Sequence, residues 1–183
     1  MGQGPSGELT EERITELKNS TKFTANEIRD WYAEFKTNFP KGVITKDAFV
    51  SMYCHLFPHG DASDFSLHLF RHSYDADGNG VIDFEEFIQA LNVSSKGSQE
   101  EKMRWAFKMY DMDGNGSVSK QETIDMITVI LINGLGSAAA KQAEETVLDI
   151  FLKLDKDMDD NLSEREFLSA AKSSSSIRDL LQL

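Results

Sequence analysis

Hydrophobic residues recur along most of this chain at the spacing of one face of an α-helix. Ile28, Trp31, Tyr32 and Phe35 stand at positions i, i+3, i+4 and i+7, which places their side chains on one side of a helix. The same spacing returns in the segments 49–57, 69–74, 84–91, 103–110, 126–131, 147–154 and 167–171. Short polar segments separate these stretches. The pattern therefore predicts an all-α chain.

Three of the polar segments share one twelve-residue pattern. They open at Asp75, Asp111 and Asp155 and read DADGNGVIDFEE, DMDGNGSVSKQE and DKDMDDNLSERE. Each carries side-chain oxygens at positions 1, 3 and 5, a backbone carbonyl at 7, a water-bridging residue at 9 and a glutamate at 12, the ligand order of an EF-hand calcium loop. Glutamates three residues after a serine also form helix capping boxes, but three matches in register favour calcium.

The predicted Ca²⁺ ligands follow from those positions. They are, in loop 75–86, Asp75, Asp77, Asn79, the Val81 carbonyl, Asp83 and Glu86; in loop 111–122, Asp111, Asp113, Asn115, the Ser117 carbonyl, Ser119 and Glu122; in loop 155–166, Asp155, Asp157, Asp159, the Asn161 carbonyl, Ser163 and Glu166. Because Asp83 adds a carboxylate to loop 75–86, we also expect that loop to accept Mg²⁺ at rest.

The third loop differs from the other two at position 6. Gly80 and Gly116 stand there in the first two loops, and Asp160 in the third. An EF-hand loop turns with φ above zero at this position, which costs a non-glycine residue about 1 kcal/mol. We therefore expect loop 155–166 to bind Ca²⁺ more weakly than its neighbours.

A fourth loop, residues 37–48, keeps the form of the motif without its ligands. The window TNFPKGVITKDA retains Gly42 at the turn and apolar Ile44 at position 8. Its ligand positions hold Thr37, Phe39, Lys41 and Ala48. Since these residues offer no carboxylate, we expect this loop only to pair with loop 75–86.

Four such units predict two lobes, each with a pair of EF-hands and a short β-bridge between paired loops. The small residues around Gly97 suggest the boundary. The expected organisation is an N-terminal lobe of residues 1–94 with loops 37–48 and 75–86, a linker of residues 95–98, and a C-terminal lobe of residues 99–183 with loops 111–122 and 155–166 and a tail helix around Ile177.

Composition narrows the function. A net charge of −12 argues for cation binding and against nucleic acid. The lone Cys54 forms no internal disulfide, which suits a cytoplasmic protein. No apolar run reaches the length of a membrane span, and no secretory signal opens the chain. Because no nucleophile stands out with a base, we expect no enzymatic activity.

The four histidines form two pairs at helical spacing. His55 with His59, and His68 with His72, are each four residues apart and could hold zinc. Because no further zinc ligand stands at a suitable spacing, solvated helix faces are the favoured interpretation.

The N-terminal half has more aromatic residues than a small core needs. Core packing explains many of them, but EF-hand sensors open on calcium to expose an apolar groove for an amphipathic target helix. The candidate groove residues are Trp31, Tyr32, Phe35, Phe49, Tyr53, Phe57, Phe70, Phe87 and Leu91.

The amino terminus reads MGQGPS. Removal of Met1 exposes Gly2, and Ser6 stands where N-myristoyl transfer prefers a hydroxyl residue. A flexible terminus that happens to begin with glycine explains the motif equally well.

Together these features resemble the neuronal calcium sensor family. The resemblance rests on Gly2, the WYAEF helix, the silent loop with PKG, FEEFIQAL, EEKMRWAFKMYDMDG and three intact loops. It implies that Gly2 carries myristate, which calcium releases from the N-terminal groove towards a membrane. The groove would then bind a helix of a receptor kinase, cyclase, channel or lipid kinase.

Some residues depart from that family. Phe39 replaces a cysteine, Asp160 replaces a glycine, and Gln3, Gly7 and Glu8 occupy the stretch where some relatives have lysines. One myristoyl chain without basic residues binds membranes marginally. We therefore expect weak, reversible, peripheral membrane association that is insensitive to anionic lipid.

Three other functions fit parts of the sequence. A calcium buffer needs the same loops but no exposed groove. A calcium-triggered photoprotein also has three working loops, but its silent loop is the second and it lacks the lipidation signal. A calcineurin B-like phosphatase subunit usually keeps its first loop intact.

Overall fold

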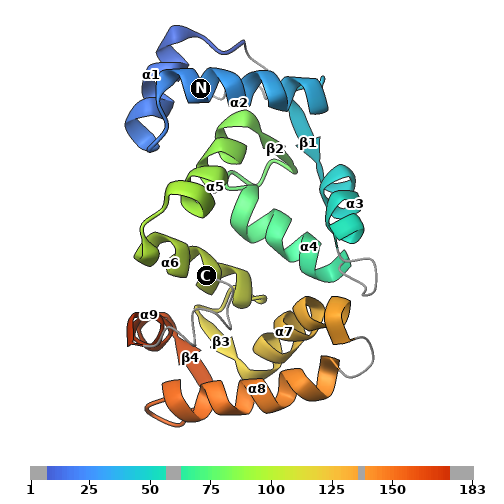
Figure 1. Ribbon diagram of the computed structural model, residues 1–183, viewed down its shortest axis with the longest axis vertical. Coiled ribbons are helices and arrows are strands. Elements are labelled where there is room, and N and C mark those ends of the chain that lie inside the picture. Colours follow the sequence, from blue (N-terminus) through green and yellow to red (C-terminus); the bar gives the residue numbers. More distant parts are fainter. Residues whose placement is uncertain (1–7, 57–62, 136–138, 174–183) are drawn as a thin grey trace.

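The computed structural model describes residues 8–56, 63–135 and 139–173. It is mostly helical (Figure 1). The N-terminal half contains α1 (Glu11–Ser20), α2 (Ala25–Asn38), β1 (Val43–Thr45), α3 (Lys46–Leu56), α4 (Ser63–Leu69), the π-helical turn η1 (Phe70–Tyr74), β2 (Val81–Asp83) and α5 (Phe84–Lys96). The C-terminal half contains α6 (Gln99–Tyr110), β3 (Ser117–Ser119), α7 (Lys120–Leu135), α8 (Ala139–Leu154), β4 (Asn161–Ser163) and α9 (Glu164–Ser173).

Four predicted features lie outside the described residues: Gly2, Phe57, His59 and the tail helix around Ile177. No helix of the described segments has the length and apolar character needed to cross a bilayer.

Two short antiparallel ladders join the loops in pairs. β1 pairs with β2, with Ile44 opposite Ile82, and β3 pairs with β4, with Val118 opposite Leu162. All four of these side chains are buried. They occupy position 8 of their loops, so the pairing of loop 37–48 with 75–86 and of 111–122 with 155–166 confirms the predicted fold class.

Capping boxes fix where several helices begin. Thr24 caps α2 together with Glu27, and Ser98 caps α6 with Glu101. In each box the hydroxyl accepts the backbone N–H of the glutamate, whose carboxylate accepts the N–H of the cap. α5 runs as far as Lys96, so Gly97 and Ser98 alone separate it from α6.

The core of the N-terminal half is built from interlocked aromatic rings. Phe35 lies 5.5 Å from Phe84 and 5.1 Å from Phe87, measured between ring centroids. Phe49 packs edge-on against Phe70 at 5.6 Å. The Phe35–Phe84 and Phe49–Phe70 pairs are edge-to-face, and such ring contacts add to the stabilisation from buried area.

The two halves meet where η1 and α4 approach α6 (Figure 1). The rings of Tyr74 and Trp105 pack edge-to-face at 5.9 Å. A ring nitrogen of buried His68 lies 3.1 Å from the Lys108 carbonyl. A further contact joins the segment between α1 and α2 to α6, where Lys22 Nζ lies 2.6 Å from a carboxylate oxygen of Glu101. The helix that enters loop 75–86 therefore packs against the helix that enters loop 111–122.

Candidate metal centres

Carboxylates converge in the three loops where the sequence predicts calcium. Within each of three triplets, one carboxylate oxygen per residue lies within 4.8 Å of the others. The triplets are Asp75, Asp77 and Glu86; Asp111, Asp113 and Glu122; and Asp155, Asp157 and Asp159. Among the described residues, clusters that could hold a metal occur at these three loops.

The first aspartate of each loop is held by the same backbone bond. An oxygen of Asp75 accepts the N–H of Gly80 at 3.0 Å, and Asp111 accepts that of Gly116 at 2.9 Å. In the last loop Asp155 accepts the N–H of Asp160 at 3.0 Å. The bond runs from position 6 to position 1, so it closes each loop around its centre.

The glutamate at position 12 of each loop reaches back from the next helix to the start of the loop. Glu86 accepts the N–H of Ala76 at 2.8 Å, and Glu122 accepts that of Met112 at 2.8 Å. The second carboxylate oxygen of each glutamate accepts the N–H of the residue at position 9. This residue is Asp83 for Glu86 and Ser119 for Glu122. The helix cap and the predicted calcium ligand are therefore the same carboxylate, so the two interpretations of this glutamate do not exclude each other.

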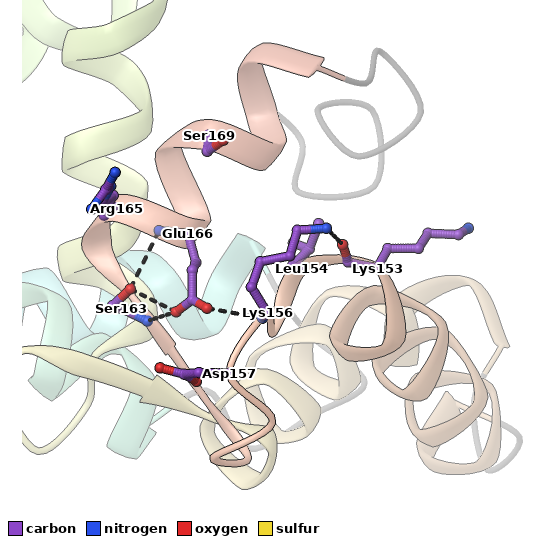
Figure 2. A pocket seen from close by; sticks show the side chains of 8 residues that line it. All are labelled: Lys153, Leu154, Lys156, Asp157, Ser163, Arg165, Glu166 and Ser169. Atoms are coloured by element: carbon purple, nitrogen blue, oxygen red, sulfur yellow. Dashed lines mark hydrogen bonds between the residues drawn. The ribbon is translucent and has the colours of Figure 1, made fainter.

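Glu166 follows this arrangement in the last loop (Figure 2). It accepts the Lys156 N–H at 2.9 Å, the Ser163 N–H at 3.0 Å and the Ser163 hydroxyl at 2.6 Å. These residues line a cavity of about 510 Å³ together with Lys153, Leu154, Asp157, Arg165 and Ser169. The side chain of Glu166 projects from α9 towards the loop, as Figure 2 shows.

The electrostatics of the loops suit a divalent cation. Burial raises the pKa of Glu86. Desolvation also raises the pKa of Asp157, and the charges of Asp159, Glu166 and Asp155 raise it further. In contrast, the hydroxyl of Ser163 lowers the pKa of Glu166. Because crowded carboxylates repel one another, a hard cation with oxygen ligands would relieve the repulsion.

The loops hold the predicted left-handed residues, with one addition. Gly80 and Gly116 have φ of 85° and 88°, and Asp160 has φ of 65°. The left-handed geometry expected for Asp160 is thus confirmed. Sequence reasoning missed Met158 at position 4, whose φ is 59°. Glycines fill that position in the other two loops, and this contrast was the available signal.

Asp160 also has a partner that the sequence reasoning missed. Its carboxylate forms an ion pair with Lys120, at the start of α7. The Lys120 ammonium lies over the ring of Phe151, 5.5 Å from the centroid. Lys120 therefore links loop 155–166 to the helix that leaves loop 111–122.

Loop 37–48 has the predicted shape but no acidic cluster. α2 continues through Thr37 to Asn38, and Gly42 has φ of 77°. Ile44 is buried in the ladder with β2. Lys41 and Ala48 supply no carboxylate, and the absence of calcium from this loop stays a prediction.

The candidate groove residues lie at different depths in this structure. Phe35, Phe49 and Phe70 are buried in the core. The half-buried members, which pack against that core, are Trp31, Tyr32, Tyr53, Phe87 and Leu91. The fully buried rings therefore lie beneath a partly exposed layer contributed by α2, α3 and α5.

The remaining histidines do not form a metal cluster among the described residues. His68 and His72 are stacked, with ring centroids 4.6 Å apart. The Nε2 atom of His68 is engaged with the Lys108 carbonyl at 3.1 Å, so this nitrogen is not available as a zinc ligand.

Comparison with known proteins agrees with the loop geometry. A family model described as an EF-hand domain pair matches residues 40–94, and another with the same description matches residues 100–172. S-modulin of Aquarana catesbeiana is 37% identical over 188 aligned residues, covering all of this chain and 93% of the relative.

Two further relatives also align along the whole chain. Neuronal calcium sensor 1 of Lymnaea stagnalis is 40% identical over 187 residues and covers 97% of its own length. Recoverin of Homo sapiens is 34% identical over 192 residues and covers 94% of its own length. The chain therefore belongs to the neuronal calcium sensor and recoverin family of EF-hand proteins, which are calcium sensors and not enzymes.

Proposed function

We propose that this protein binds Ca²⁺ through loops 75–86, 111–122 and 155–166 and then regulates a membrane-associated target. The observation that carries the proposal is the repeated carboxylate triplet, closed in each loop by the same backbone bonds. The ligands are the eighteen groups named from the sequence. Loop 155–166 is the weakest site, because two non-glycine residues adopt left-handed geometry there.

The groove is the proposed output of calcium binding. Trp31 and Phe87 are half-buried and their rings lie 6.2 Å apart. Phe87 packs against buried Phe35, and Trp31 packs against the same core. A change in the angle between the helices that flank loop 75–86 would uncover these rings, and an amphipathic helix of the target would cover them.

Further parts of the proposal concern the membrane and magnesium. Myristate on Gly2 would anchor the protein reversibly at the periphery of membranes, so that a cytoplasmic and a bound form coexist. A receptor kinase, cyclase, channel or lipid kinase is the class of target that the family resemblance suggests. Mg²⁺ in loop 75–86 at rest is supported by the carboxylate of Asp83 beside Glu86.

Calorimetric titration of the whole chain with Ca²⁺ tests the sites. The wild type should show three sites, and each of Glu86→Gln, Glu122→Gln and Glu166→Gln should lose one. A wild type that saturates at two ions would contradict the assignment of loop 155–166. Repeating the titration in Mg²⁺ should shift the apparent affinity of loop 75–86 alone.

Calcium-dependent retention on a hydrophobic matrix tests the groove. The wild type should bind with Ca²⁺ and elute with chelator, and Trp31→Ala should reduce retention. Met52→Ala is the matched control, because Met52 is exposed on α3 and is not a candidate groove residue. Calcium binding without any retention would mean a calcium buffer.

A further inference from the structure

Polar contacts join helix α1 to helix α5. The guanidinium group of Arg13 donates from Nε to Glu85 Oε1 at 2.6 Å, and its terminal nitrogen contacts the same oxygen. One turn further along α5, Gln89 Nε2 donates to Ser20 Oγ at 2.8 Å. The side chains of Arg13 and Glu85 are 27% and 41% exposed. Because the pair is partly buried, salt screens it less than an exposed pair.

Glu85 directly precedes the glutamate that closes loop 75–86. Glu85 and Glu86 both stand in the first turn of α5. A carboxylate oxygen of Glu86 lies within 4.8 Å of oxygens of Asp75 and Asp77 in the candidate metal centre. Neighbouring side chains of a helix point about 100° apart, so Glu85 reaches α1 while Glu86 reaches the loop. A shift of this turn would therefore move both carboxylates.

A cavity of about 400 Å³ lies between α1 and the start of α5. Its lining includes Glu16 and Leu17 of α1 and Glu85 and Glu86 of α5. A cavity lacks the contacts that fix side chains in a close-packed core. The polar contacts between the two helices therefore contribute to the position of the first turn of α5.

We propose that Arg13 is a positioning residue for calcium binding in loop 75–86. Through Glu85 it holds the first turn of α5 where Glu86 meets the other carboxylates of the loop. This inference rests on the proposed calcium site in that loop. Coupling between two equilibria is reciprocal, so Ca²⁺ in the loop strengthens the attachment of α1 by the factor that this attachment adds to Ca²⁺ affinity.

The charge of Arg13 acting directly on the ion would have the opposite effect. A cation near an acidic loop repels Ca²⁺, so Arg13→Met would strengthen binding if that repulsion dominated. Loss of the Arg13–Glu85 pair should instead weaken binding, because Glu86 is no longer held in place. The sign of the change therefore distinguishes positioning from direct repulsion.

NMR titration of the full chain in chelator-buffered Ca²⁺ can follow each site separately. The Gly80 N–H donates to Asp75 in loop 75–86, and the Gly116 N–H donates to Asp111 in the next loop. The amide signal of Gly80 therefore reports the first loop, and that of Gly116 the second. Circular dichroism of each variant checks that it is folded.

Arg13→Met and Glu85→Gln should each weaken Ca²⁺ binding in loop 75–86 by about two- to fivefold, as expected for the loss of one ion pair. The double variant should bind no more weakly than the weaker single variant, because both substitutions remove the same contact. Binding in loop 111–122 should not change in any of the three.

Arg29→Met is the matched control. Arg29 lies on α2 and pairs with Glu11 of α1 at 2.8 Å, so this substitution removes an ion pair of α1 that does not involve α5. It should leave the Ca²⁺ affinity of loop 75–86 unchanged. Hydrogen exchange of the α1 amides should slow on Ca²⁺ binding in the wild type and in Arg29→Met, and much less in Arg13→Met.

Several results would overturn the proposal. Stronger binding in Arg13→Met, or additive effects in the double variant, would assign a direct charge effect to Arg13. Equal weakening by Arg29→Met would make the general stability of α1 responsible. A Gly80 signal whose Ca²⁺ response is unchanged in Glu86→Gln would overturn the calcium site in loop 75–86 itself, which separates failure of the proposed function from failure of the positioning role.

Discussion

Lys120 directly follows strand β3, and Asp160 directly precedes strand β4. The two residues therefore lie one step beyond the same end of the antiparallel β3–β4 ladder. The ladder pairs Ser119 with Asn161 as its last partners, and the next two residues form an ion pair. Asp160 is also the residue that adopts left-handed geometry where the other calcium loops have glycine. The Asp160 side chain therefore has two opposing effects. Its Cβ atom opposes the left-handed backbone conformation, and its carboxylate connects loop 155–166 to Lys120 at the start of α7.

A double-mutant cycle on this pair should reveal the coupling. Asp160→Gly removes the strain and the ion pair together, whereas in a Lys120→Met background it removes the strain alone. We therefore expect Asp160→Gly to stabilise the calcium-free protein more in the second background. The difference should be about 0.2–1 kcal/mol, as for other exposed pairs. Urea unfolding of the four proteins in chelator measures it, and additive effects would show that the ion pair contributes nothing.

Met158 offers a test of strain without a lost contact. Its side chain is 85% exposed and its φ is 59°. Met158→Gly should therefore stabilise the calcium-free protein by about 1 kcal/mol and raise the affinity of loop 155–166 several-fold. Met158→Ala is the matched control, because alanine keeps the Cβ atom that opposes left-handed geometry. Equal effects of the two substitutions would argue against strain as the cause.

The silent loop should support its partner through Ile44. Ile44 is buried opposite Ile82 in the β1–β2 ladder. Ile44→Ala should lower the free energy of unfolding by about 2–5 kcal/mol and weaken Ca²⁺ binding in loop 75–86 several-fold. Binding in loop 111–122 should not change, because that loop pairs with 155–166.

Calorimetry with chemical denaturation checks both effects. Lys41→Ala is the control, since Lys41 is exposed in the same loop. A destabilised Ile44→Ala protein with unchanged affinity in loop 75–86 would separate the silent loop from calcium binding.

Sequence reasoning reached most of this architecture for a definite physical reason. Calcium loops need oxygen ligands at fixed spacing, so the residues that follow Asp75, Asp111 and Asp155 predict the three loops from sequence alone. Apolar Ile44 and Ile82 at position 8 predict that their loops pair. Lys120 and Asp160 were out of reach because they are forty residues apart in sequence and meet only through the register of the ladder. The exposure of individual aromatic side chains could not be predicted either, because hydrophobic periodicity shows which face of a helix is apolar but not how deeply each side chain on that face is buried.

The contact between Lys22 and Glu101 should depend on acid pH. The hydrogen bond from Lys22, followed by those from Ser98, lowers the pKa of Glu101 from 4.5 to about 2. Because the folded-state pKa is depressed, the contact stabilises the fold fully above pH 4.5 and loses this effect as the pH falls towards 2. Lys22→Met should therefore lower the urea midpoint near neutral pH, and the difference from the wild type should vanish at the acid end of that range.

NMR titration of the Glu101 carboxyl should show its pKa rising in the variant while staying below 4.5, because Ser98 still donates to it. Lys18→Met, an exposed substitution on α1, should change neither quantity, and an ordinary pKa for Glu101 in the wild type would contradict the assigned link between the two halves.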